Sequence, residues 1–191
     1  VAADPDCGRE VGGLVVDDEV WSASEGAVHL TANMMVMDDA SLTIEPGVRV
    51  CMSEGTGIVV RGAFVARGTE SEPIVFGPDV EGVDSGYWSN ISLTTTTPDA
   101  LFDEAGEYVS GAIMEHVDLS HGGGGESVIG LVETHNVAVF FRDVSISESE
   151  TNAIAINAET GEGTLPLTRI VSSDFHNYGA HAVWIYGYGL D

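Results

Sequence analysis

The chain has 191 residues, and 31 acidic side chains against 6 basic ones give it a formal net charge of −25. A charge of this size repels nucleic-acid phosphates, anionic lipid and acidic polysaccharides, so we expect no nucleic-acid partner. No apolar run approaches the roughly 18 residues of a membrane-spanning helix, so we expect no membrane span. The length suits one domain with a continuous core. The acidity itself fits a salt-adapted surface as well as a cation-binding one.

The first third of the chain begins with a polar stretch marked by Gly and Pro, residues 1–12. Short apolar runs follow at residues 14–16, 28–30 and 34–37, and each predicts a strand. We predict that residues 1–39 form a tail and a cap, which covers the edge of the strands that follow. An uncovered parallel edge would otherwise invite association.

The next stretch, from Ala40 to Phe76, consists of very short β-branched or aromatic runs cut off by turn residues. Strands this short fit poorly in a sandwich, but they fit a solenoid in which the chain turns a corner every few residues. Leu42 and Phe64, which begin equivalent runs, are 22 residues apart, as expected for one turn of such a solenoid. The sequence therefore predicts an all-β fold, a single-stranded parallel β-helix over residues 40–191. The runs are 42–44, 48–50, 58–60, 64–66 and 74–76.

Three motifs in this stretch resemble a known family. LTIEPGV at 42–48, GAFVARG at 62–68 and EPIVF at 72–76 resemble the opening coils of the secreted bacterial right-handed β-helix repeat proteins, which belong to the pectin-lyase-like superfamily. Residues 13–36 resemble the N-terminal start of that family. The resemblance implies a right-handed β-helix and a secreted protein, present here in a mature, processed or trimmed form because the sequence carries no signal peptide.

A fourth motif, GYWSNI at residues 86–91, resembles the next coil of the family, where GDWGGI is usual. Tyr87, Ser89 and Asn90 depart from that pattern. The fold implied by the resemblance carries lyases, hydrolases, adhesins and inert scaffolds alike, so it implies no single function.

The two cysteines, Cys7 and Cys51, fit one disulfide that ties the N-terminal segment to the first full coil. Such a pairing suits a secreted protein. Closing a loop of this length contributes about 3–4 kcal/mol in the chain-entropy model. The alternative is two buried free thiols that act as small apolar side chains.

The second half of the chain contains the clearest repeat: EHVDLS at 115–120, RDVSIS at 142–147 and VSSDFH at 171–176 align by position. The alignment predicts that Glu115 lies opposite Arg142. A second strand is expected after each repeat, at 128–129, 153–156 and 182–185. Two interior columns are predicted, the first formed by Leu119, Ile146 and Phe175, and the second by Met114, Phe141 and Ile170.

Residues 98–111 form the longest excursion from this pattern, and they are acidic with several large apolar side chains. Loops on a rigid scaffold often carry binding sites, so this segment is a candidate ligand-binding loop. The alternative is a lid packed over the side of the solenoid. The candidate residues are Leu101, Phe102, Asp103, Glu104 and Tyr108.

The repeat also brings three corners to one edge of the predicted solenoid, where His and Glu gather. Dense carboxylates suit Ca²⁺, and added imidazoles suit Zn²⁺ or another transition metal. No spacing within one loop matches a known ligand motif, and the alternative is a row of solvated turn residues. The candidate metal ligands are His121, Glu126, Glu148, Glu150, His176 and His181. Ca²⁺ is the one cofactor that we consider for this corner.

A hydrolase or lyase must be weighed because the resemblance includes polysaccharide-degrading enzymes. A lyase needs a base, commonly Arg or Lys in β-helix families, and this chain has no Lys. A glycoside hydrolase needs two carboxylates about 5–9.5 Å apart. Asp118 and Asp143 are weak candidates for that pair, since any acidic solenoid offers such neighbours. The sequence therefore favours a non-catalytic protein, leaves an enzyme open as the alternative, and assigns no catalytic residue firmly.

The sequence from residue 182 onward still has the character of a coil, which predicts either a truncated chain or end-to-end assembly. The favoured function is an extracellular, non-catalytic structural or adhesive module at the cell surface. Its partners would be copies of itself, or other surface components and glycans. The alternatives are a glycan hydrolase or lyase of the β-helix superfamily, and a Ca²⁺-dependent carbohydrate or surface binder.

Overall fold

The structure, a computed structural model, describes residues 7–158 and 167–187. The remaining parts of the predicted tail (1–6) and of the predicted coils (159–166 and 188–191) lie outside the described residues. Within the described part the fold is all-β, and the one helical element there is the 3-10 turn η1 (Ala23–Glu25). No helix in these ranges has the length and apolar character needed to cross a bilayer.

The strands are short, as the frequent turn residues predict. Those of the first half are β1 (Arg9–Val15), β2 (Glu19–Trp21), β3 (Val28–Val36), β4 (Ser41–Ile44), β5 (Arg49–Met52), β6 (Ile58–Val60), β7 (Ala63–Arg67), β8 (Ile74–Pro78) and β9 (Ile91–Leu93). Those of the second half are β10 (Leu101–Phe102), β11 (Tyr108–Ser110), β12 (Ile113–Ser120), β13 (Gly130–His135), β14 (Phe140–Ser149), β15 (Asn152–Asn157), β16 (Arg169–Val171), β17 (Asp174–Tyr178) and β18 (Val183–Tyr186).

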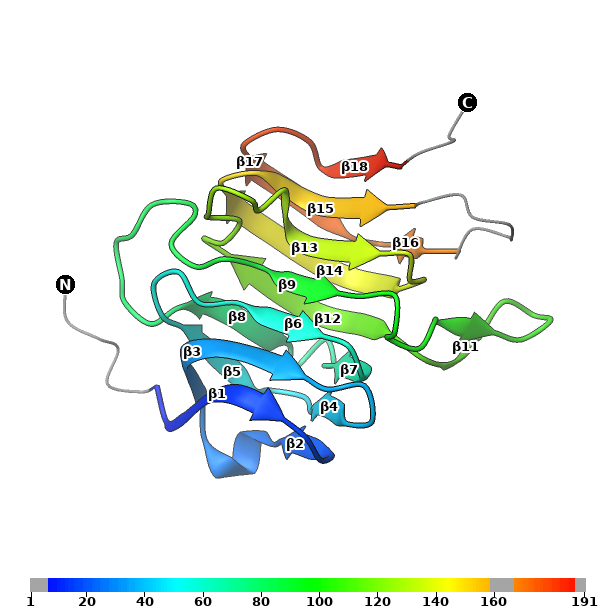
Figure 1. The fold of residues 1–191 in the computed structure, drawn as a ribbon, viewed down its shortest axis with the longest axis horizontal. Coiled ribbons are helices and arrows are strands. Elements are labelled where there is room, and N and C mark those ends of the chain that lie inside the picture. Colours follow the sequence, from blue (N-terminus) through cyan, green and yellow to red (C-terminus); the bar gives the residue numbers. More distant parts are fainter. Residues whose placement is uncertain (1–6, 159–166, 188–191) are drawn as a thin grey trace.

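All of these strands except β10 and β11 belong to one 16-stranded sheet, and its ladders are parallel. A parallel ladder needs the chain to travel away and come back, so each pass of the chain lies beside the one before. Figure 1 shows these passes following one another from the blue end to the red end. The predicted all-β class with a large parallel sheet is confirmed, and the arrangement is compatible with a β-helix.

The interior columns predicted from the repeat are confirmed by the registers. Leu119 pairs with Ile146, and Ile146 pairs with Phe175. Met114, Phe141 and Ile170 form the second column in the same way. The spacing of 22 residues between Leu42 and Phe64 is also a true register. These apolar stacks run through several passes and make up most of one buried core cluster.

A second row of inward-facing side chains belongs to β3, β6, β9, β13, β15 and β18. Ile58 pairs with Ile91, which pairs with Val132, and Val132 pairs with Ile154. The strand expected at 128–129 is wrong, because β13 begins only at Gly130. A turn closed by the Val128 amide and the Gly125 carbonyl occupies that position.

The N-terminal segment shares ladders with the strands that follow it. β1 pairs with β3, and β3 pairs with both β5 and β6, so strands on both sides of residue 39 belong to the same sheet. The predicted boundary between cap and coils stays a prediction. The predicted disulfide is confirmed: Cys7 and Cys51 are joined, with Cα atoms 5.8 Å apart.

Two positions at which the chain bends, either within a strand or at its end, have a left-handed backbone that recurs in successive passes, and we call them corners. One corner is formed by His116, Asp143 and Ser172, with φ of 48°, 52° and 51°. The other is formed by His121, Glu148 and Asn177, with φ of 62°, 51° and 53°. Residues other than Gly seldom adopt positive φ. The recurrence therefore shows that these three passes share one backbone geometry at each of the two corners.

Candidate functional site

The predicted binding loop is a small antiparallel hairpin, β10–β11, that packs on the outer face of the sheet. The Phe102 ring lies edge-on to Phe140 with centroids 5.2 Å apart, and the Tyr108 ring stacks on Phe140 at 5.9 Å. Leu101 points away and is 56% exposed. The Asp103 carboxylate accepts hydrogen bonds from the Ala105 and Glu107 amides and so closes the hairpin tip near Glu104. The hairpin therefore packs as a cover over the outer face of the sheet around Phe140.

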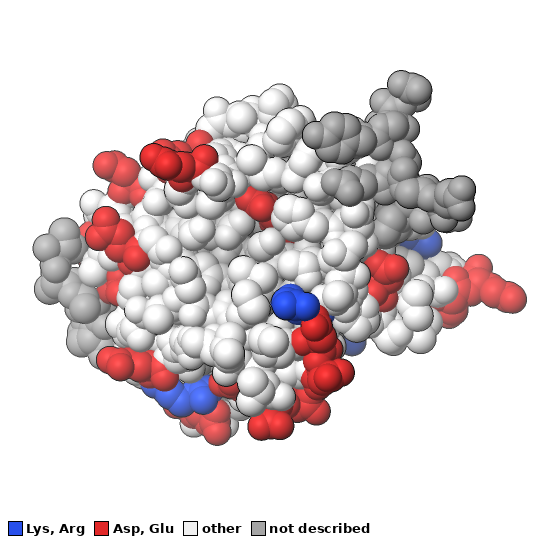
Figure 2. Space-filling view, viewed as in Figure 1, with Lys and Arg blue, Asp and Glu red and all other residues white. Residues whose placement is uncertain are grey.

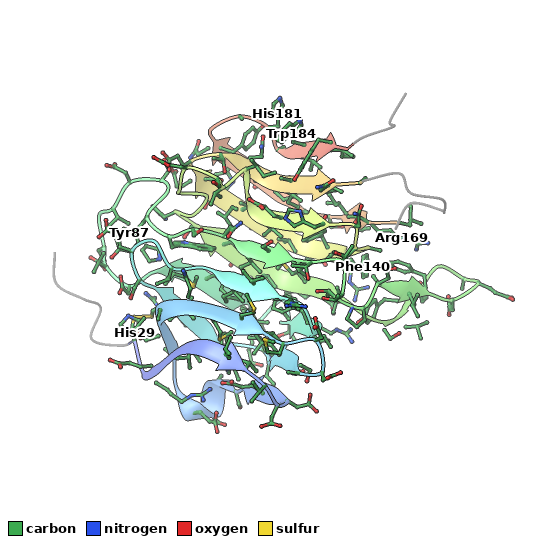
Figure 3. The ribbon with its side chains drawn as sticks, viewed as in Figure 1. His29, Tyr87, Phe140, Arg169, His181 and Trp184 are labelled. Atoms are coloured by element: carbon green, nitrogen blue, oxygen red, sulfur yellow. A yellow bond between two sulfur atoms is a disulfide. The ribbon has the colours of Figure 1, made fainter. Side chains whose placement is uncertain are left out.

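Three of the six basic residues of the chain gather beneath this hairpin. The guanidinium of Arg169 lies 3.7 Å from the Phe102 ring centroid and donates a hydrogen bond to the Gly106 carbonyl. Figure 3 shows Phe140 and Arg169 together at the base of the hairpin. Cation–π contacts of this kind contribute about 0.5–2 kcal/mol each, so they fix the hairpin rather than leave it mobile.

Glu115 lies buried between the other two arginines. Its Oε2 is 2.7 Å from Nε of Arg67, and its Oε1 accepts from Arg142 on the following pass. The predicted pairing of Glu115 with Arg142 is therefore confirmed, and Arg67 adds a second partner on the preceding pass. One buried carboxylate thus joins three passes of the chain.

At the corner predicted to hold a metal, the strands have the register that the aligned repeats predict. Ser147 pairs with His176, so Glu148 lies opposite Asn177, whose side-chain amide donates to it at 2.7 Å. His176 instead lies 3.3 Å from the carboxylate of Asp174 on its own strand.

The remaining candidate ligands of that corner face different neighbours. The Nδ1 of His181 is 2.9 Å from the Asn152 side-chain oxygen, and its ring stacks near Trp184 (Figure 3). His121 has a buried Nδ1 that makes no hydrogen bond, while Glu126 and Glu150 are exposed. In the described ranges no three His, Cys, Asp or Glu side chains are arranged to hold an ion. The metal site stays a prediction.

The two weak catalytic candidates occupy different kinds of position. Asp118 is an outward residue of β12 that pairs with Ser145, and burial by its surroundings raises its pKa. Asp143 is a left-handed corner residue, and its Oδ2 is 3.8 Å from Nε2 of His116. The register does not place them opposite each other.

One polar cluster was missed by the sequence reasoning. Nε2 of His29 is 2.9 Å from Oδ2 of Asp79, and the Ser53 hydroxyl donates to the same oxygen at 2.6 Å. The Tyr87 hydroxyl donates to Oδ1 at 2.8 Å. Figure 3 shows His29 and Tyr87 near one another on the N-terminal half. The signal in the sequence was Tyr87 itself, one of the positions at which residues 86–91 depart from the GDWGGI pattern.

The electrostatics of this cluster keep Asp79 ionised. Burial alone would raise its pKa, but hydrogen bonds from Ser53, His29 and Tyr87 outweigh burial, so the pKa of Asp79 is lowered. Burial and the hydrogen bond to Asp79 raise the pKa of Tyr87 to about 12. A carboxylate stabilised in this way is an acceptor that joins loops, and it is a poor proton donor.

Glu133 in β13 is a second buried carboxylate that several hydrogen-bond donors keep ionised. It is buried, yet it accepts hydrogen bonds from the Ile129 amide at 2.8 Å and from the Gly130 amide. His135 lies 3.3 Å from its other oxygen. Burial opposes ionisation, but His135 and the two amides outweigh it and lower the pKa of Glu133. The buried carboxylates Asp79, Glu115 and Glu133 are thus each held by several donors.

Comparison with known proteins adds no family to this picture. No protein-family model matches the sequence, and no curated protein or solved structure matches it either.

Proposed function

We propose that the chain is an extracellular, non-catalytic structural or adhesive module, a right-handed parallel β-helix that associates end to end. The observation that carries this proposal is the last described pass, β16, β17 and β18. It continues the ladders of the earlier passes but leaves inward-column side chains uncovered.

The exposure is clearest on β18. Ile185 continues the column of Ile156 and is 59% exposed, although earlier members of this column such as Val60 and Leu93 are fully buried. Trp184 is 37% exposed on the same strand. Exposed apolar side chains on an extended strand are a surface that another strand can cover.

The edges of the sheet support the same proposal. Among the described residues, β18 has one strand neighbour, β15, and β1, the first strand of the same row, has one neighbour, β3. An open parallel edge presents unpaired backbone groups that accept a further strand. Because both ends have parallel edges, the C-terminal end of one copy can stack on the N-terminal end of the next. Such a head-to-tail contact is heterologous and propagates.

The buried carboxylates support the non-catalytic part. Asp79, Glu115 and Glu133 are each used to join neighbouring segments, and the pKa values of Asp79 and Glu133 are lowered. A general acid needs a raised pKa instead. The Cys7–Cys51 disulfide supports an extracellular location, since disulfides persist in oxidising compartments.

Sedimentation velocity over a range of protein concentrations tests the proposal. We expect association to grow with salt, because the net charge of −25 opposes contact and the screening length falls from about 10 Å at 0.1 M to about 3 Å at 1 M salt. Ile185→Asp should abolish association. The control is Val109→Asp, which changes a residue equally exposed on the hairpin. Monomers at every concentration and salt level, or association unchanged by Ile185→Asp, would contradict the proposal.

A second candidate is a glycan hydrolase in which the general acid is Asp118, an exposed outward residue of β12 whose pKa is raised by partial desolvation. A raised pKa is what a general acid requires. Turnover of a neutral oligosaccharide that Asp118→Asn abolishes would establish this function in place of the first. Turnover retained in Asp118→Asn would exclude Asp118 as the acid.

A further inference from the structure

The outer face of β1, β3 and β6 carries a row of apolar side chains. Leu14 pairs with Met35, and Met35 pairs with Val59, so the three lie side by side on neighbouring passes. Passes lie about 4.8 Å apart, so the row spans roughly 10 Å. Leu14 is 65% exposed, and Val16 continues the exposed side of the strand beyond the buried Val15. Large aliphatic side chains therefore face solvent here.

A groove of about 370 Å³ runs beside this row. Gly13 and Gly57 form part of its floor because they have no side chains, and at Gly57 a Cβ would lie 2.9 Å from the Asn90 carbonyl oxygen. Asn33 lines the groove and uses its side-chain oxygen to accept the Gly57 amide. The volume is at the low end for ligand pockets, which is room for one or two side chains of a partner.

The acidic side chains around the groove favour a partner that carries positive charge. Figure 2 shows this face of the molecule: its middle is largely free of charged side chains, and acidic side chains gather along the margins. Arg61, which directly follows β6, is already paired with Asp38 at 2.8 Å. An apolar centre with an acidic surround attracts a basic partner and repels anionic lipid and nucleic acid.

We propose that this groove binds a segment of a partner polypeptide that has an aliphatic or aromatic anchor flanked by Lys or Arg. The anchor packs against Leu14, Met35 and Val59 in the groove. The flanking basic side chains face the acidic margins. The groove includes residues of β1, on the N-terminal end that the proposed end-to-end association would also use, so peptide binding must be measured on monomeric protein.

Fluorescence anisotropy with a labelled synthetic heptapeptide tests the proposal. The peptide has a Leu-Trp-Leu centre with two lysines on each side, and the protein is kept at concentrations where sedimentation shows monomers. We expect saturable binding that weakens as salt screens the charges. Leu14→Asp should weaken it about tenfold or more, as expected for loss of a central apolar contact. Leu101→Asp is the matched control, an equally exposed leucine on the hairpin, and should change the Kd less than about twofold.

Two further peptides separate the contributions. Replacing the lysines by glutamates should remove binding, and replacing the centre by Gly-Ser-Gly should weaken it about tenfold or more. The proposal is overturned if Leu14→Asp binds as tightly as the wild type, if the Gly-Ser-Gly peptide binds equally well, or if Leu101→Asp has the larger effect. Displacement of the peptide by a neutral oligosaccharide alone would assign the groove to a glycan instead. Circular dichroism melts confirm that both variants are folded.

Discussion

His29 and Asp79 lie 50 residues apart in the chain, and Nε2 of the first is 2.9 Å from Oδ2 of the second. The contact joins the third strand to the loop after the eighth, and Ser53 contributes the segment between them. Asp79 is thus an acceptor shared by three segments. The buried Asp79 carboxylate therefore holds three segments of the N-terminal half together.

The first prediction concerns this acceptor. Asp79→Asn should lower the free energy of unfolding by about 2–3 kcal/mol, because the donors of His29, Ser53 and Tyr87 lose a charged partner in a buried site. Urea unfolding followed by circular dichroism measures the change. Asp174→Asn is the control, since its side chain is 81% exposed, and it should change stability by less than about 0.5 kcal/mol. Equal effects of the two substitutions would contradict the assignment.

The second prediction concerns how the free energy of unfolding depends on pH. The pKa values of Asp79 and Glu133 are lowered in the folded state. Their stabilisation is therefore present above the unfolded values of about 3.9 and 4.3, and it is lost as the pH falls through the folded values. The stability gap between the wild type and Asp79→Asn/Glu133→Gln should be constant from pH 7 to about 5 and close below about pH 4. A gap independent of pH down to pH 2 would contradict it.

The third prediction concerns the ion pairs of Glu115. A double-mutant cycle of Glu115→Gln and Arg142→Gln should give a coupling of about 1–3 kcal/mol, because the carboxylate is buried and has a second partner in Arg67. The matched cycle is Asp38→Asn with Arg61→Gln, a pair exposed on both sides, and its coupling should stay at or below about 1 kcal/mol. Chemical denaturation of the four variants in each cycle gives both values. A larger coupling in the exposed pair would refute the account.

The fourth prediction concerns the interior columns. Ile146→Ala removes a fully buried side chain between Leu119 and Phe175, and it should cost about 2–5 kcal/mol through lost contacts and the cavity left behind. Ile185→Ala changes an exposed isoleucine and should cost less than about 0.5 kcal/mol in monomeric protein. Thermal or urea unfolding at low concentration compares the two. Similar costs would show that Ile185 is buried in solution.

The fifth prediction concerns the disulfide. Cys7→Ser/Cys51→Ser should lower the free energy of unfolding by up to about 4 kcal/mol, because the bond closes a loop of 44 residues in the unfolded chain. Unfolding curves of the double variant, and of the wild type with and without a reducing agent, measure it. Reductant should leave the double variant unchanged, and a shift there would point to an effect unrelated to this bond.

The columns could be predicted from sequence because their cause is local. Ile146 and Phe175 stand at the same position of two similar hexapeptides, and β-branched and aromatic residues at such positions face a shared core. The pairing of Glu115 with Arg142 then followed from the same register. The disulfide followed from there being only two cysteines.

The contacts between side chains of irregular segments could not be predicted in this way. His29 and Asp79 belong to parts of the chain with no common repeat, so no spacing connects them. At the metal corner the candidate ligands were chosen by residue type, whereas the register of the aligned repeats places Asn177, and no histidine, opposite Glu148. The register of the preceding strands decides which turn residues lie opposite each other on neighbouring passes. The type of residue in a turn predicts those neighbours less well.

The left-handed corners at His116, Asp143 and Ser172 have a consequence for how this molecule can be lengthened. A stretch that runs from one such corner to its equivalent on the next pass enters and leaves with the same backbone direction, which makes it an interchangeable building block. Duplicating residues 117–143 would add one step of about 4.8 Å along the direction in which the passes stack, while every neighbour keeps an equivalent surface to stack on. The number of passes, and with it the extent of the molecule along the stacking direction, can therefore be changed in steps of one whole pass.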